Sequence, residues 1–281
     1  MTDLILRDYH TLDECRRIVE LEKTIWGYTD SEDLVPAIML FLTAKRGGIL
    51  IAAERADGSL AGFAFSMASI VDGKPAQWSH MMGVVPECRA TGLGRTLKLA
   101  QRARALALGV DLIEWTFDPL QAVNAHLNFA KLGTIATTYE INIYGDSSSA
   151  LHRGTPTDRL IAEWWIRRPH VERRISAGPL IARDRSATEA ISLNPPVAGE
   201  RWQRPGPVTP APEGARRLLI HVPARFTEMQ QSEPDLALEW RMQTRELFTS
   251  CFARGYRAVD FLRHRDEGGA YLLAERPTED A

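Results

Sequence analysis

Residues 83–95 read GVVPECRATGLGR, and this stretch decides the fold that the sequence predicts. Pro86 ends a strand, because proline cannot continue a hydrogen-bonded ladder. Gly92 and Gly94 then allow the backbone to approach a ligand closely where a helix begins. Amides at a helix start favour an anion, together with the helix dipole, and Arg89 adds positive charge. The stretch therefore predicts an anion site that fits a diphosphate, although its spacing does not select a nucleotide.

The stretch lacks the two best-known glycine-rich phosphate motifs. The GxxxxGK[ST] sequence of a P-loop is absent, and the GxGxxG sequence of dinucleotide-binding folds is absent as well. The strand before the loop also belongs to a predicted antiparallel hairpin and not to a βαβ unit. Both classes of nucleotide-binding protein are therefore excluded.

Two hairpins are predicted upstream of the loop. Strands are expected over Ile49–Glu54 and Leu60–Ile70, on either side of Asp57-Gly58. A second turn at Asp72-Gly73 leads into a third strand over Gln77–Val85. Both dipeptides are typical of two-residue hairpin turns, because Asp and Gly tolerate the backbone angles that such turns need.

Helical patterns stand before and after these strands. A capping box at Thr11–Glu14 predicts the start of the first helix, which should stop near Gly27. The second helix is expected from Ser31 or Glu32 to Arg46. The helix after the glycine loop is expected to bury Leu93, Leu97, Ala100, Ala107 and Leu108. Further strands are expected over Leu4–His10, Asp111–Asp118, Ile135–Tyr144 and Leu160–Ile166, and a short helix over Asn124–Leu132.

This order of elements predicts an α/β fold with a mixed, mostly antiparallel central sheet and helices on both faces. The first domain is expected over residues 1–170. A proline-rich irregular connection follows over 171–214, and a small C-terminal α/β extension is expected over 215–281. In that extension a strand, a helix over Pro234–Arg254 and a hairpin around Asp266–Gly269 are predicted.

Composition narrows the class of protein. The 281 residues carry 34 Lys and Arg against 36 Asp and Glu, so the net charge is −2. This balance lacks the basic excess of a general nucleic-acid binder, and no apolar run is long enough for a membrane span. Three separated cysteines favour neither a disulfide framework nor a zinc site. We therefore expect a cytoplasmic protein with no metal, no nucleic-acid partner and no membrane partner.

With these elements in place, the sequence resembles the GNAT superfamily of acyl-CoA-dependent N-acyltransferases. The family's pyrophosphate loop, Arg/Gln-x-x-Gly-x-Gly/Ala, is matched by Arg89–Gly94 after a strand and before a long helix. The family's short helix ending in Lys-Leu-Gly is matched by Asn124–Gly133, and the resemblance covers about residues 4–166. Stretches such as Trp115–Leu120 and Thr157–Leu160 also look like a less-studied branch of long GNAT-like proteins with a C-terminal extension.

The resemblance implies where the acyl-CoA would bind. The strand segment Met82–Val85 would pair with the amide-rich pantetheine arm, and the amide of Val84 would polarise the thioester carbonyl as an oxyanion donor. Asn124 and Asn128 of the short helix would contact the arm. The implied cofactor-binding residues are Met82, Gly83, Val84, Val85, Arg89, Ala90, Thr91, Gly92, Leu93, Gly94, Arg95, Asn124 and Asn128.

The acid and the base are less well defined. Many family members carry a tyrosine four residues before the closing glycine of the short helix, as the acid for the thiolate, but here that position is Phe129. Tyr139 or a water molecule would substitute, or the thiolate would leave unassisted. For the base, regular alternation places His80 on the same strand face as Val84. Asp118, at the end of the next strand, is a second candidate.

The resemblance implies transfer of an acetyl or similar short acyl group from acyl-CoA to an amine by direct attack. The expected acceptor is a small-molecule amine, with an amino acid as one option, and the protein could act as a homodimer. Two alternatives remain open. One is succinyl transfer from succinyl-CoA to an amino acid, and the other is a non-catalytic acyl-CoA-binding regulatory module.

Overall fold

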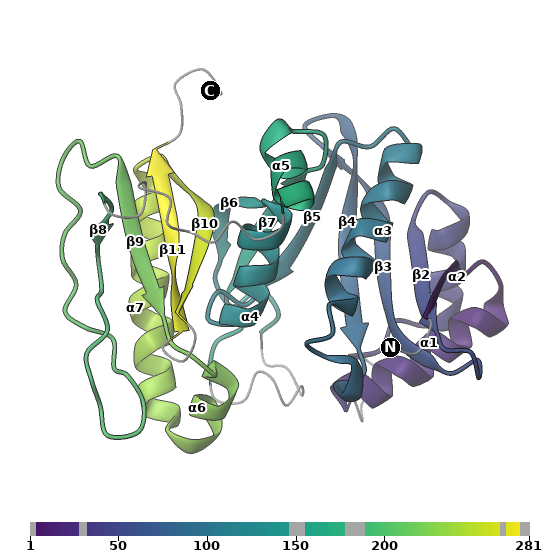
Figure 1. Cartoon of the computed structure of the whole chain (residues 1–281), viewed down its shortest axis with the longest axis horizontal. Coiled ribbons are helices and arrows are strands. Elements are labelled where there is room, and N and C mark those ends of the chain that lie inside the picture. Colours follow the sequence, from purple (N-terminus) through teal and green to yellow (C-terminus); the bar gives the residue numbers. More distant parts are fainter. Residues whose placement is uncertain (1–3, 28–32, 146–154, 178–188, 265–267, 276–281) are drawn as a thin grey trace. The chain divides into compact units, whose positions relative to one another are not determined.

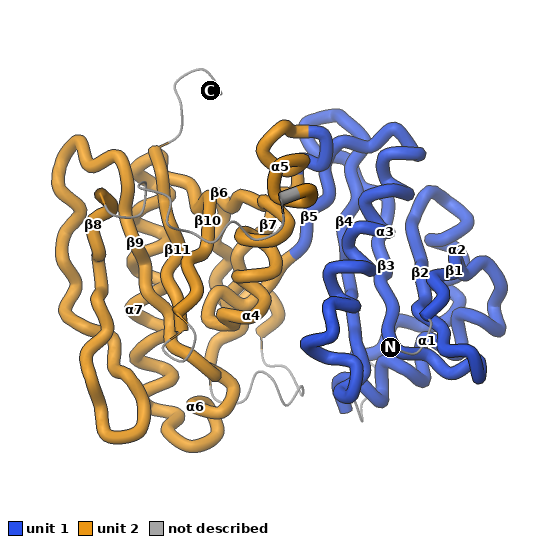
Figure 2. The backbone as a smooth tube through the Cα atoms, viewed as in Figure 1, with its two compact units in different colours: residues 1–115, 148–150, 165–167 blue, residues 116–147, 151–164, 168–281 orange. Residues whose placement is uncertain are grey.

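The chain is an α/β protein, whose helices and strands are drawn in Figure 1. They belong to two compact units, which Figure 2 shows in different colours. The first unit consists of Met1–Trp115 with two short later segments, and the second contains most of the chain from Thr116 onward. The computed structural model describes residues 4–27, 33–145, 155–177, 189–264 and 268–275.

The first unit is built on strands in the order β1-β2-β3-β4-β5. Neighbouring strands are antiparallel except β4 and β5, which are parallel. The predicted mixed, mostly antiparallel sheet is therefore confirmed. The elements are β1 (Ile5–Asp8), α1 (Leu12–Trp26), α2 (Ala37–Lys45), β2 (Ile49–Glu54), β3 (Leu60–Val71), β4 (Lys74–Val84), the 3₁₀ turn η2 (Pro86–Cys88), α3 (Leu93–Ala107) and β5 (Leu112–Phe117).

Helices cover both faces of this sheet, as predicted. Phe63 packs in one buried cluster with Ile18 of α1 and Leu40 of α2. The neighbouring residue, Gly62, faces the other way, and a Cβ built on it would touch Leu97 of α3. Because side chains alternate along a strand, α1 and α2 lie on one face and α3 lies on the other.

Local signals set the ends of the first helices. The predicted capping box is present, since the Thr11 side chain accepts from the Glu14 amide and Glu14 returns a bond to the Thr11 amide. Helix α1 ends at Gly27, whose φ of 66° is left-handed. The predicted start of α2, at Ser31 or Glu32, lies outside the described residues, and within them α2 begins only after Pro36. Proline disfavours helical backbone at the residue before it.

The two predicted hairpins are confirmed. Strands β2 and β3 pair antiparallel, and so do β3 and β4. In the second turn Val71 pairs with Lys74, and the two residues between them, Asp72 and Gly73, both have positive φ (48° and 74°). These angles are those of the turn type that Asp-Gly favours.

The buried stripe of α3 differs from the prediction. Ala107 and Leu108 are exposed, whereas Lys98 and Gln101 are buried. Leu93, Leu97, Gln101 and Ala105 follow steps of four residues, and Lys98 lies three residues before Gln101, so position on the helix and not chemical type decides burial. An expectation built on apolar residues alone therefore missed two polar residues in the core.

The second unit is built on strands in the order β7-β6-β10-β11-β9-β8. Its neighbours are antiparallel except β8 and β9. Helix α7 contacts β6, β9 and β10. The elements are α4 (Ala122–Ala125), the π-helix η3 (His126–Leu132), β6 (Ile135–Glu140), β7 (Arg159–Trp165), α5 (Pro169–Ala177), β8 (Ile191–Ser192), β9 (Arg217–Val222), α6 (Phe226–Ser232), α7 (Pro234–Ala253), β10 (Tyr256–His264) and β11 (Gly268–Glu275).

The C-terminal strands join the same sheet as β6 and β7. Strand β10 pairs with β11, as predicted for the hairpin, and also with β6 through Ala258 and Ala136. Part of the predicted hairpin turn, residues 266–267, lies outside the described residues. The short helix ends at Gly133, whose φ is 74°, as predicted, but it begins earlier and includes a π-helix. None of the described helices is long and apolar enough to cross a membrane.

Candidate functional site

The glycine loop of the first unit has the backbone geometry of an anion site. Ala90 and Gly92 both have positive φ (62° and 94°), and Gly92 is the N-terminal cap of α3. A Cβ on Gly92 would meet no atom within 4 Å, so the positive φ and not crowding favours glycine there. The amides of Leu93 and Gly94 lie in the first helical turn, where no intrahelical acceptor exists. These donors and the helix dipole can hold a phosphate oxygen.

Side chains of the loop fix its shape. The Thr91 Oγ1 donates to the Cys88 carbonyl at 2.7 Å, and the Arg89 Nε donates to the Val84 carbonyl at 3.2 Å. Arg89 and Thr91 are exposed and Arg95 is half-buried. The loop is thus ordered by its own contacts and keeps a guanidinium beside the end of β4.

The end of β4 has one edge that is not covered by a neighbouring strand. The Val85 amide donates to the Ala61 carbonyl of β3 at 3.0 Å. Because amides alternate between the two edges of a strand, the amide and carbonyl of Val84 point to the opposite edge. The parallel ladder of β4 with β5 contains only the pairs Gln77–Ile113 and Trp78–Glu114. The β4 edge at Met82–Val85 is therefore free of β5 pairing and can pair with an extended amide-containing ligand.

The alternation expected around His80 is interrupted. Phe65 pairs with Met81, and Met67 pairs with Trp78, so one residue of β3 faces two of β4, Ser79 and His80. This β-bulge removes the regular alternation that placed His80 on the face of Val84, so that premise is wrong. His80 keeps solvent contact, and its ring packs edge-on against Phe65 with centroids 6.2 Å apart. Desolvation lowers the pKa of His80 below its ordinary 6.5.

The hypothesis that His80 is the base gives a direct prediction. A base works in its neutral form, and the lowered pKa keeps His80 neutral down to a pH below 6.5. If His80 is the base despite the bulge, His80→Ala should reduce kcat/KM by about 100-fold and remove an acidic limb centred below pH 6.5. His10→Ala, at an exposed histidine of the same unit, is the control. A pH–rate profile that keeps its acidic limb in His80→Ala would remove His80 from the mechanism.

Asp118 and Tyr139 belong to the second unit, where both are bound by other side chains. Asp118 accepts from the Arg241 Nη2 at 2.8 Å and from the Leu120 amide at 2.9 Å. Although burial acts to raise it, the pKa of Asp118 is lowered by the Arg241 guanidinium. The Tyr139 hydroxyl donates to Asp158 at 2.8 Å, and burial raises the pKa of Tyr139. These contacts favour structural roles for both residues.

The short helix of the second unit carries two predicted site residues, Asn124 and Asn128, and Phe129 at the usual tyrosine position. Asn124 is exposed, whereas Asn128 is buried and its Nδ2 has no hydrogen-bond partner among the described residues. Phe129 is fully buried, with its ring 6.0 Å from Phe117 and 5.5 Å from Tyr271. The usual tyrosine position is thus a core position here.

Sequence reasoning missed two buried polar groups. The first is Lys98, which is 2% exposed in the first unit. The second is the set of contacts around Asp158 in the second unit, where Arg245 donates two bonds of 2.8 Å. A usable signal existed for the second, because Arg241 and Arg245 stand four residues apart on a predicted helix and share a face.

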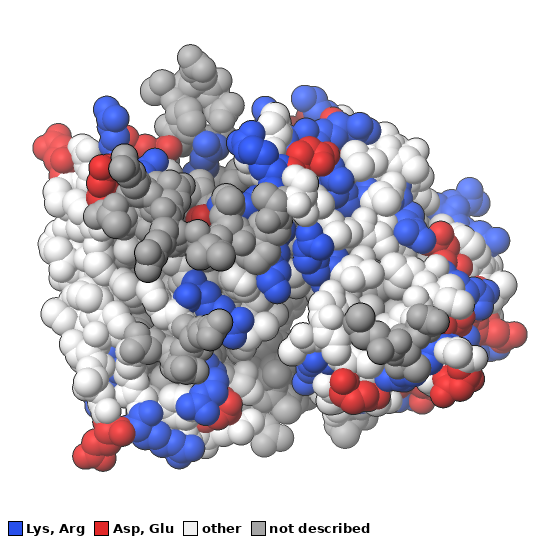
Figure 3. Space-filling view, viewed as in Figure 1, with Lys and Arg blue, Asp and Glu red and all other residues white. Residues whose placement is uncertain are grey.

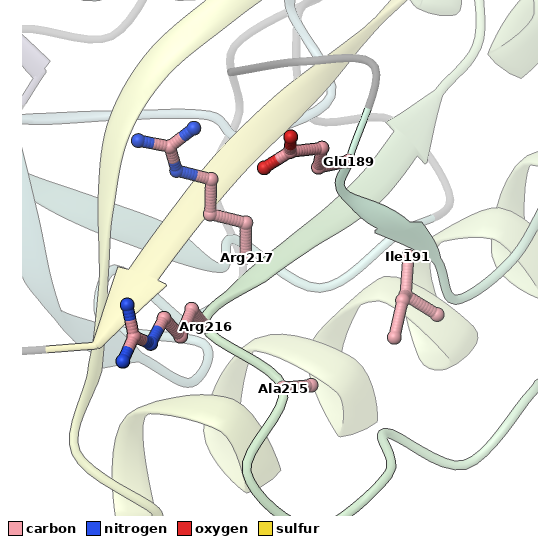
Figure 4. A pocket seen from close by; sticks show the side chains of 5 residues that line it. All are labelled: Glu189, Ile191, Ala215, Arg216 and Arg217. Carbon is pink, nitrogen blue, oxygen red and sulfur yellow. The ribbon is translucent and has the colours of Figure 1, made fainter. Parts of the chain in front are cut away.

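Three further features were compared with the predicted site positions within the described part of the chain: a cavity, the metal-ligating residue types and the surface charge. A cavity of about 230 Å³ in the second unit contains none of the predicted positions (Figure 4). Within the described residues, no group of His, Cys, Asp or Glu could hold a metal ion. Both signs of charge occur on the face in Figure 3, as expected for a net charge of −2. The lining residues of the cavity are Glu189, Ile191, Ala215, Arg216 and Arg217.

Comparisons with known proteins gave matches among solved structures. No protein-family model and no curated protein matches the chain. The chain is similar to a candidate acetyltransferase of Acinetobacter baylyi ADP1, with 20% identity over 60% of this chain and 96% of that one and a TM-score of 0.48. It is also similar to the ribosomal-protein-S18-alanine N-acetyltransferase of Escherichia coli, with 16% identity over 57% of this chain and 92% of that one and a TM-score of 0.46. A third similar structure is an acetyltransferase of the GNAT family from Streptococcus pneumoniae, with 15% identity over 57% of this chain and 98% of that one and a TM-score of 0.46.

Proposed function

We propose that the protein is an acyl-CoA-dependent N-acyltransferase of the GNAT type. The observation that carries this proposal is the position of the glycine loop directly after the uncovered edge of β4. Within a few residues, the first unit offers donors for a diphosphate and a strand edge for an amide-rich arm. In a CoA thioester, an amide-rich pantetheine arm is joined to a diphosphate, just as the β4 edge is joined to the glycine loop.

The chemistry follows from these backbone groups. The loop amides with Arg89 would hold the diphosphate, and Met82–Val85 would pair with the pantetheine arm. The Val84 amide would donate to the thioester oxygen as negative charge develops there. The acceptor nitrogen attacks the carbonyl carbon, the C–S bond breaks, a base takes the ammonium proton, and the thiolate takes a proton from an acid or from water. We propose a small-molecule amine as the acceptor.

The missing tyrosine keeps a second function in consideration. Phe129 has no proton to give a departing thiolate, and its ring is packed in the core. A module that binds acyl-CoA without turning it over needs no such acid. Thiol release in the presence of amines separates the two functions, since only the enzyme produces free CoA. Binding without turnover across a broad amine panel would favour the module.

The first experiment is a thermal-shift screen with acetyl-CoA, succinyl-CoA, malonyl-CoA and free CoA. A ligand that binds only the folded state raises the melting temperature, by an amount equivalent to about 2.7 kcal/mol at 100 times its Kd. We expect a shift of several degrees with CoA species and none with equal concentrations of inorganic pyrophosphate. A larger shift with succinyl-CoA than with acetyl-CoA would favour the succinyl transfer. No shift with any CoA species, in protein shown to be folded, would refute the proposed function.

A further inference from the structure

The point where β4 and β5 part is defined by two residues. The ladder between these strands stops at the pair Trp78–Glu114, so the next pair would be Ser79 with Trp115. Ser79 belongs to the bulge of β4, where β4 carries one residue more than β3. The strands therefore separate at Ser79 and Trp115, and the uncovered β4 edge begins there.

One side chain of α3 contacts both of these residues. The Lys98 Nζ donates to the Ser79 Oγ at 2.8 Å and lies 3.6 Å from the centre of the Trp115 ring. It also donates to the Gln101 Oε1 at 3.3 Å, and the Ser79 Oγ donates to the same oxygen at 3.1 Å. The amine thus lies over the first position at which β4 and β5 no longer pair.

Burying the Lys98 amine at this position costs desolvation free energy. Lys98 is 2% exposed and forms no ion pair with any described carboxylate. Its neighbours from β4, α3 and β5 are Ser79, Gln101 and Trp115, and none of them carries a charge. Burial lowers the pKa of Lys98 to about 7, while the face of the Trp115 ring favours the charged form. An apolar side chain of similar length would fill the space without the cost of desolvating an amine.

We propose that Lys98 is a positioning residue, which holds Ser79 and Trp115 in place where β4 and β5 stop pairing and thereby fixes the start of the β4 edge that would pair with the acyl-CoA arm. This inference rests on the proposed function. By binding Ser79 on one strand and the Trp115 ring on the other, the amine holds both strands at the first unpaired position. Backbone groups held in place before binding lose less entropy when the ligand pairs with them. Lys98 would therefore act on affinity through the strands and not by touching the ligand.

The test substitutes Lys98→Met, which keeps the apolar stem and removes the amine. We expect the Kd for acetyl-CoA, measured by calorimetry, to rise at least tenfold. The Ser79–Gln101 bond remains, and a thioether packs well on an indole, so the melting temperature should stay equal or rise. Lys74→Met, at the exposed start of β4, is the matched control and should leave both quantities unchanged.

The pH dependence gives an independent readout of the buried amine. The unfolded chain holds the Lys98 proton up to about pH 10.5, whereas the folded chain releases it near pH 7. Wild-type stability therefore rises relative to Lys98→Met as the pH increases from 7 to 10.5. We expect the advantage of Lys98→Met in melting temperature to be larger at pH 6 than at pH 9.5.

The outcomes separate this inference from the proposed function. Wild-type protein that binds no CoA species refutes the proposed function itself. Wild-type binding with a Kd in Lys98→Met within twofold of the wild-type value refutes only the positioning role. If Lys98→Met does not fold, Ser79→Ala decides, because it removes one contact of the amine and leaves the lysine in place. A Kd raised at least threefold in folded Ser79→Ala supports the role, and an unchanged Kd overturns it.

Discussion

Replacing Gly92 by glutamate should abolish measurable binding of CoA thioesters. The φ of Gly92 is 94°, a region that L side chains rarely adopt, so any side chain there strains the start of α3 by about 1–2 kcal/mol. A carboxylate would also stand where the first-turn amides attract an anion, and it would repel a diphosphate. Together these effects should raise the Kd by about 100-fold or more in calorimetry.

The chain offers a matched control for this substitution. Gly73, in the turn between β3 and β4, has a φ of 74° and, like Gly92, open space around its Cβ position. Because this turn lies at the opposite end of β4 from the glycine loop, Gly73→Glu adds similar strain and the same charge away from that loop. It should lower stability by a similar amount and leave the Kd unchanged. Unchanged CoA affinity in Gly92→Glu would contradict the assignment of the loop.

Much of the first unit was predictable because local chemistry decides it. Asp72-Gly73 specifies its turn through backbone angles that few other dipeptides adopt. Thr11 and Glu14 form a capping box that depends only on their own spacing. The glycine loop is equally local, since Gly92 is needed for its own φ. Hairpins, helix ends and the candidate anion site could therefore be predicted from short stretches.

The remainder depends on residues that are distant in sequence. Asp118 meets Arg241 across 123 positions, and no pattern around either residue indicates the other. The bulge in β4 is visible only in its pairing with β3. The alternation of β4 alone therefore gave a wrong prediction for the strand face of His80. Lys98 looks like a surface residue of an amphipathic helix, and only its packing against β4 and β5 shows that it is buried. Charged residues in the core are the hardest part of such a sequence to predict.

Replacing Asp158 by alanine should cause the largest loss of stability in the second unit. The carboxylate is fully buried and accepts from the Tyr139 hydroxyl at 2.8 Å and from the Asn142 amide at 3.0 Å. It also receives both hydrogen bonds of the Arg245 guanidinium, each at 2.8 Å. Removing one partner of a buried ion pair leaves the other charge without compensation, which costs about 3–5 kcal/mol. The midpoint of urea unfolding, followed by fluorescence, should fall accordingly.

An exposed ion pair of α7, the helix that carries Arg245, provides the comparison. Glu239 of α7 pairs with Arg204 at 3.0 Å, and both side chains are about half exposed (45% and 58%). Solvent screens such a pair, so Glu239→Ala should cost less than about 1 kcal/mol. If Asp158→Ala costs no more than Glu239→Ala, the contacts of Asp158 do not hold α7 against β6. A large loss in Asp158→Ala with a small one in Glu239→Ala would show that these buried contacts join the C-terminal helix to the strand that follows the short helix. The C-terminal residues would then be a structural part of the second unit and not a detachable extension.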